Sequence, residues 1–151
     1  MNDITAQLIM LKQSITVLLE NVTEETMYNR PIPHKRSILE LINHISCIPA
    51  ADVLLSQSVS HQEIDAYYHQ NWRISLPDIV NKFQCNMDSM IHYFQTQSVL
   101  ELEKNSTSYW GAVHSQKGWA LQIIEHLVHH RAQLHMYLDF SGTLKKIQLF
   151  D

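Results

Sequence analysis

Residues 118–138 read GWALQIIEHLVHHRAQLHMYL, and this stretch decides the fold. Its apolar side chains recur every three or four residues, which is the spacing of one face of an α-helix. Ser115 is a candidate N-cap before the stretch, and Ser141-Gly142 after it is typical of a helix that ends at a glycine C-cap. The sequence therefore predicts one long helix that ends at about Phe140.

Three further segments show the same helical period. The first runs from Ile4 to Val22, the second follows the capping-box pair Ser37 and Glu40, and the third starts at Ser75. Their predicted apolar stripes are Ile4, Leu8, Leu11, Ile15, Leu18 and Val22; Ile38, Leu41, Ile42, Ile45 and Ile48; and Ile79, Phe83, Met87, Met90, Ile91 and Phe94.

The remaining segments show no strand-like alternation. Residues 60–72 are interpreted as a connecting segment with some helix, and residues 99–118 as an irregular crossover. Only 3 glycines and 4 prolines occur, which suits long helices. We therefore expect an all-α fold, a four-helix bundle, in a single domain over residues 1–151.

The composition indicates a soluble cytoplasmic protein. The chain is 45% hydrophobic, and its formal net charge of −4 argues against a nucleic-acid partner. The two cysteines, Cys47 and Cys85, are too few for a disulfide framework and are interpreted as reduced thiols. No basic signal-peptide start and no apolar run of about 20 residues is present, so no membrane association is expected.

The chain contains 10 histidines, and helical geometry indicates which of them share a face. With His126 at zero and about 100° per residue, the apolar face of residues 118–138 is centred near 75°. His130 falls near 40°, inside that face, whereas His129 falls near −60° and points away. His126 lies at the edge, so His126 and His130 are the predicted pair.

An isolated core histidine is more often hydrogen-bonded to a carbonyl or a carboxylate than bound to a metal. His126, one turn away on the same side, favours the metal interpretation, because residues four apart can bind one ion together. His44 borders the apolar face of the second helix in the same way and is the predicted third ligand. His92 is the second choice for that role, and Cys47 is a substitute at best.

Three protein nitrogens with one open position are typical of a catalytic rather than a structural metal site. The predicted ligands are His44, His126 and His130, and no general acid or base is assigned. Gln122, Trp119 and Tyr137 are further candidates for lining the site, although packing is the expected role of the two aromatic residues.

The run His126, His129, His130, Arg131 and Gln133 resembles the last helix of the DinB/YfiT-like superfamily. The segment SILELINHIS, after Pro31-Ile-Pro33, is similar to the family's other signature. The resemblance covers nearly the whole chain. It implies a four-helix bundle, usually dimeric, with a histidine triad that binds nickel, zinc or a similar ion, and the matching residues are His44, His126 and His130.

The resemblance also suggests an activity, since some members are S-transferases or isomerases that use bacillithiol, mycothiol or glutathione. We expect a metal-dependent transferase that acts on a low-molecular-weight thiol, with a homodimer as the assembly. The alternative is a non-catalytic metal-binding stress-response protein. A third hypothesis is an interaction bundle in which the histidines are incidental.

Overall fold

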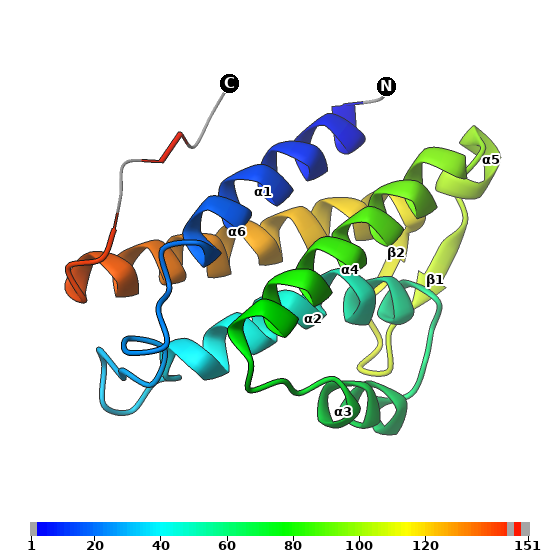
Figure 1. The fold of residues 1–151 in the computed structure, drawn as a ribbon. Helices are drawn as coiled ribbons and strands as arrows, with labels where there is room; N and C mark the ends of the chain where they lie inside the picture. Colours follow the sequence, from blue (N-terminus) through cyan, green and yellow to red (C-terminus); the bar gives the residue numbers. More distant parts are fainter. Residues whose placement is uncertain (1–2, 145–146, 149–151) are drawn as a thin grey trace.

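The computed structural model describes residues 3–144 and 147–148, so both ends of the predicted domain lie outside the described residues. Four long helices form the bundle: α1 (Asp3–Leu19), α2 (Ile38–Ser56), α4 (Leu76–Thr96) and α6 (Gln116–Phe140). Figure 1 shows them lying side by side along most of their lengths. The fold is all-α, as the sequence predicted.

Each of α1 and α2 packs against both α4 and α6. This arrangement makes α2 and α6 neighbours, although about sixty residues separate them in the chain. The pairing matters for function because α2 carries His44, while α6 carries His126 and His130.

The apolar stripes predicted from the sequence form the core. Every stripe residue from Ile38 to Ile48 and from Ile79 to Phe94 is buried, and so are Leu8, Leu11, Ile15 and Leu18. Ile4 is only partly buried at the start of α1. The first helix ends at Leu19 rather than Val22, and Val22 packs into the core from the following turn.

Local hydrogen bonds set the ends of the helices. At the start of α2, the Glu40 N–H donates to Ser37 Oγ at 3.2 Å, and the Ser37 N–H donates to Glu40 Oε2 at 2.6 Å, which completes the predicted capping box. At the end of α6, Gly142 has a φ of +69°. The Thr143 N–H donates to the Leu138 carbonyl and the Gly142 N–H to the Asp139 carbonyl, which is a Schellman C-cap.

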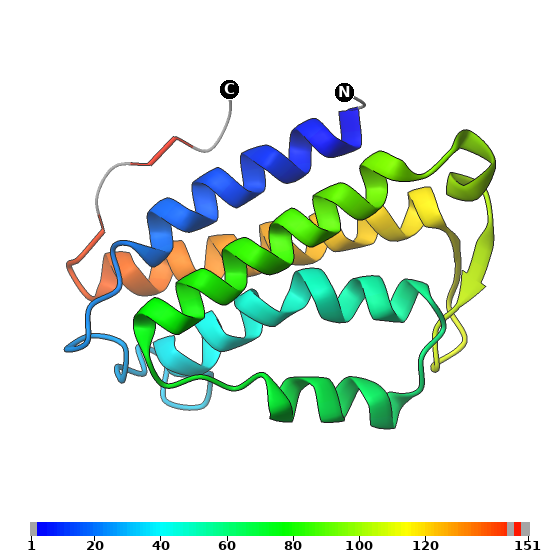
Figure 2. The same ribbon diagram turned by 45° about the vertical axis from the view of Figure 1, so that its right-hand side comes forward.

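The segment interpreted as a connection is a regular helix, α3 (His61–Gln70), capped by Ser60 and Glu63. Figure 2 shows α3 running along α2, on the side away from α1. The loop between α1 and α2 is tied to the start of α2: the Ile38 N–H donates to the Asn29 carbonyl, and the Leu39 N–H donates to the Met27 carbonyl.

The crossover interpreted as irregular contains short regular elements. The crossover contains a short helix, α5 (Val99–Leu102), and a hairpin of β1 (Asn105–Thr107) and β2 (Val113–Ser115). The strands are antiparallel, with Ser106 opposite His114. At three residues each they are too short for period-two alternation to be visible in the sequence.

Helix α2 is long and apolar enough, by composition alone, to cross a membrane. However, 67% of its most apolar window is buried inside the protein. Its apolar side chains are therefore accounted for by the core of the bundle.

Candidate metal centre

Three histidines from two helices meet at one point. His44 of α2 and His126 and His130 of α6 each offer a ring nitrogen, and these nitrogens all lie within 4.8 Å of one another. His44 Nε2 and His130 Nε2 are 3.1 Å apart. The ring centroids of His44 and His130 are separated by 4.5 Å, and those of His126 and His130 by 4.9 Å.

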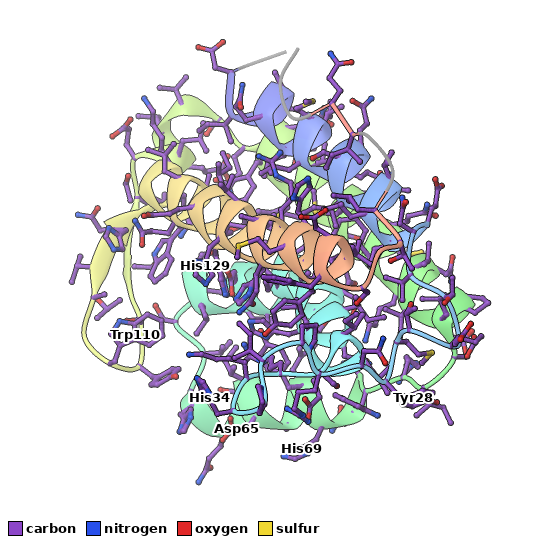
Figure 3. The ribbon with its side chains drawn as sticks, turned by 90° about the vertical axis from the view of Figure 1, so that its left-hand side faces the viewer. Tyr28, His34, Asp65, His69, Trp110 and His129 are labelled. Carbon is purple, nitrogen blue, oxygen red and sulfur yellow. The ribbon has the colours of Figure 1, made fainter. Side chains whose placement is uncertain are left out.

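The side chains take the positions expected from the helical phase. His130 is 6% exposed and lies within the core face, whereas His44 and His126 are half-buried at its edge. His129, labelled beside α6 in Figure 3, is exposed and lies outside the cluster. Among the described residues, only the three predicted histidines form such a cluster.

The other candidates lie elsewhere. His92 is exposed on α4, and Cys47 is buried one turn after His44, outside the group of converging nitrogens. Trp119 and Tyr137 are buried in the core, in agreement with a packing role. Gln122 is exposed.

Two polar side chains fix the orientation of the α6 histidines. Asp52 Oδ2 lies 2.7 Å from His126 Nδ1. Because a carboxylate accepts a hydrogen bond, Nδ1 carries the proton and Nε2 keeps its lone pair. Gln133 Oε1 lies 3.0 Å from His130 Nδ1 and has the same effect there. Both imidazoles therefore present an unprotonated Nε2 for binding, as metal-ligating histidines do.

Sequence reasoning missed Asp52 and Tyr68. Asp52 is a buried acid in an otherwise apolar stretch of α2, and a buried carboxylate requires a partner, so its position was a usable signal. The Tyr68 ring stacks on the His44 ring, with centroids 5.5 Å apart and planes at 22°. Nothing in the spacing of residues 60–72 indicates that α3 folds back against His44.

Burial favours the neutral form of His44 and of His130. Burial lowers the pKa of His44 to about 3, and the positive charge of Arg36 adds to this effect. Burial also lowers the pKa of His130 to about 4, although its hydrogen bond to Gln133 acts in the opposite direction. Neutral imidazole is the form that binds a metal ion.

Burial, followed by the negative charge of Asp52, raises the pKa of Tyr68 far above its ordinary value. The phenol therefore keeps its proton and can act as a hydrogen-bond donor beside His44.

A cavity of about 650 Å³ opens beside His44. The α1–α2 loop contributes charged residues to its wall, α2 contributes His44 and Cys47, and α3 contributes Tyr68. The histidine cluster thus borders a space large enough for a small organic molecule.

Three imidazole nitrogens on rigid helices, held by a carboxylate and an amide, fit a divalent first-row transition ion. An adjoining cavity is what a site with an exchangeable coordination position needs. The fold and this cluster define a helical bundle with a histidine-rich candidate metal centre.

The model of the DinB superfamily matches residues 7–134, and the chain belongs to that superfamily. A search of curated proteins found no match.

Three solved structures are similar to this chain. A putative member of the DinB family from Exiguobacterium sibiricum is 27% identical and superimposes with a TM-score of 0.82, over 99% of both chains. A DinB-like protein from Bacillus subtilis is 17% identical with a TM-score of 0.74, over 98% of this chain and 97% of that one.

The third structure is a mycothiol-dependent maleylpyruvate isomerase, which is 10% identical with a TM-score of 0.63. The match covers 93% of this chain and 61% of the isomerase. This similarity and that to the Bacillus protein concern the fold.

Proposed function

We propose that His44, His126 and His130 bind one divalent ion, nickel or zinc, and that the protein is a thiol S-transferase. The observation that carries this proposal is the convergence of three imidazoles, one of which, that of His44, lines a cavity. The fold shared with the mycothiol-dependent isomerase supports a thiol as one substrate.

The donor set explains why a thiol suits this centre. Three neutral imidazoles leave the charge of a divalent ion uncompensated, so an anionic fourth ligand is favoured. When bound, the ion would act as a Lewis acid that lowers the pKa of a thiol and favours the nucleophilic thiolate.

The protein's own groups hold and orient the reactants. Asp52 and Gln133 keep the α6 imidazoles in the binding tautomer. The protonated Tyr68 phenol beside His44 can donate a hydrogen bond to a group in the cavity. In the transfer, the sulfur forms a bond to an electrophilic carbon, the leaving group departs with its electron pair, and the thiol proton passes to solvent.

The test is a titration of cobalt-substituted protein with bacillithiol and glutathione, followed by absorption spectroscopy. We expect a sulfur-to-metal charge-transfer band and the formation of a conjugate when a reactive electrophile is added. If no thiol perturbs the cobalt spectrum and no conjugate forms, the transferase proposal is wrong. The protein would then be a non-catalytic metal-binding stress-response protein.

We also propose a homodimer, on the basis of the family resemblance alone. Sedimentation equilibrium at micromolar concentration tests it, with twice the 17.6 kDa chain mass as the expected result. A mass of one chain over the whole concentration range would overturn it.

A further inference from the structure

The cavity beside His44 differs in charge from the rest of the chain. Three cationic side chains line it, Arg30, Lys35 and Arg36, with Glu40 as the one carboxylate in its wall. The whole chain has a formal net charge of −4. A positive cavity in a negatively charged protein attracts anions from solution.

The carboxylate of Glu40 is already engaged. Its Oε2 lies 2.9 Å from Arg30 Nη2 and also accepts the Ser37 N–H of the capping box. Arg30 is further held by a hydrogen bond to the Lys35 carbonyl. Arg30 and Glu40 therefore neutralise each other and fix the loop.

The charges of Lys35 and Arg36 are not neutralised in this way. Within residues 3–144 and 147–148, neither side chain forms an ion pair. Both side chains are exposed at the cavity wall, so they are accessible to a solute. Arg36 is close enough to the histidine cluster for its charge to disfavour protonation of both His44 and His130.

Aromatic side chains also line the cavity. Tyr68 lies against His44, and Trp72 is 46% exposed at the cavity. Figure 3 shows His34 of the α1–α2 loop and His69 of α3 on the same side of the molecule, and both residues line the cavity. The loop and α3 thus both border the space beside His44.

Guanidinium groups recognise carboxylates through paired hydrogen bonds, and aromatic rings pack against a flat or apolar body. From the unpaired cations and the aromatic side chains, we propose that this cavity binds an organic carboxylate and that Arg36 is its principal anchor. One part of this inference rests on the proposed function, namely that the carboxylate belongs to one of the two reactants, the thiol or the electrophile.

The first test uses metal-free protein, so that it is independent of the metal and of catalysis. Benzoate is titrated by isothermal calorimetry and compared with benzamide, which has the same shape without the charge. We expect benzoate to bind about tenfold more tightly, because a charge-assisted hydrogen bond to a carboxylate is stronger than one to a neutral amide. Equal affinity for the two probes would overturn the proposal.

The second test locates the site. Arg36→Gln should weaken benzoate binding about tenfold, and Arg36→Lys should retain part of it. Lys117→Gln is the matched control, because it removes one charge from the exposed surface of α6, away from the cavity, and should leave the affinity unchanged. If Lys117→Gln weakens binding as much as Arg36→Gln, only the net charge matters and the proposal fails.

A third measurement identifies the source of the carboxylate. In cobalt-substituted protein, the binding of mercaptosuccinate is compared with that of 2-mercaptoethanol, a thiol without a carboxylate. If Arg36→Gln weakens only mercaptosuccinate binding, the cavity recognises the thiol. If the variant instead raises the KM of a carboxylate-bearing electrophile without affecting thiol binding, the cavity recognises the acceptor. Absence of any thiol effect on cobalt, with benzoate binding intact, would reject the transferase function but not the anion site.

Discussion

At the residue scale, the centre depends on which ring nitrogen each histidine presents. Nδ1 of His126 and of His130 is occupied by Asp52 and Gln133, so Nε2 is the binding atom in both residues. His44 Nε2 lies 3.1 Å from His130 Nε2, so without a metal the His44 Nε2–H can donate to His130 Nε2, and a bound ion would take the place of that proton. The three histidines could therefore hold an ion between them.

His130 and His129 provide the sharpest test of the metal centre. We expect His130→Ala to abolish stoichiometric binding of nickel or zinc, because it removes the buried ligand of the cluster. His129→Ala should leave binding nearly intact, because His129 is exposed and lies outside the cluster. Equilibrium dialysis with elemental analysis measures both, and the reverse pattern would show that the proposed ligand set is wrong.

Asp52 should act through His126. Asp52→Asn replaces the buried carboxylate with a group of equal size that holds the Nδ1–H less strongly, so we expect about a 10- to 100-fold loss of metal affinity. Asp88→Asn is the matched control, because Asp88 is an exposed acid of α4 that pairs with Lys12 and lies outside the histidine cluster. Competition with a chromophoric chelator measures both affinities; equal values for the two variants would exclude a positioning role for Asp52.

The lowered pKa values of His44 and His130 predict how the stability of the metal-free protein depends on pH. Between the ordinary histidine pKa of 6.5 and the folded values of about 3 and 4, the unfolded chain binds more protons than the folded chain. The free energy of unfolding should therefore fall as the pH drops from about 6.5 towards 4.

Urea denaturation at a series of pH values measures this dependence. His130→Gln removes one of the two titrating groups, so its stability should depend less steeply on pH over the same range. A free energy of unfolding that is constant between pH 6.5 and 4 would contradict the assigned burial of these rings.

At the scale of the elements, the cap of α2 connects the fold to the site. The capping box of Ser37 and Glu40 starts the helix that carries His44, and Glu40 also holds Arg30 of the loop. One carboxylate thus positions both the helix that supplies a ligand and the loop that supplies the charges of the cavity.

Ser37→Ala should destabilise the protein by about 1 kcal/mol, which is the usual cost of losing a helix N-cap side chain. The urea midpoint measures this effect. Ser60→Ala removes the equivalent cap of α3, a ten-residue helix that packs mainly on α2 and contributes only Ile64 to the buried residues. We expect a smaller change of midpoint there, and a larger effect than that of Ser37→Ala would contradict this account of the two caps.

At the scale of the whole molecule, the sequence predicts most of what the bundle needs. The helical periods of α1, α2, α4 and α6 are visible because apolar residues recur along a buried face of each helix, and the phase of α6 separates His130 from His129. The hairpin and the partners Asp52 and Tyr68 are not predicted, because they depend on which elements meet in space. Helical period shows which face of α2 is buried, but not that α6 and α3 cover it.

A bound ion should link α2 to α6 and so stabilise the whole fold. An ion that binds only the folded state stabilises it by about 4 kcal/mol when present at a thousand times its Kd. We expect nickel or zinc to raise the Tm, a chelator to reverse the rise, and His129→Ala to respond as the unmodified protein does.

His44→Ala distinguishes an ion that bridges α2 and α6 from an ion that is bound by α6 alone. The variant keeps the His126 and His130 pair on α6, so weak binding should persist while most of the thermal stabilisation is lost. Calorimetric scans with and without metal measure this difference. If His44→Ala keeps the full rise in Tm, the ion is held by α6 alone, and the open position next to the cavity no longer follows from the three-histidine centre.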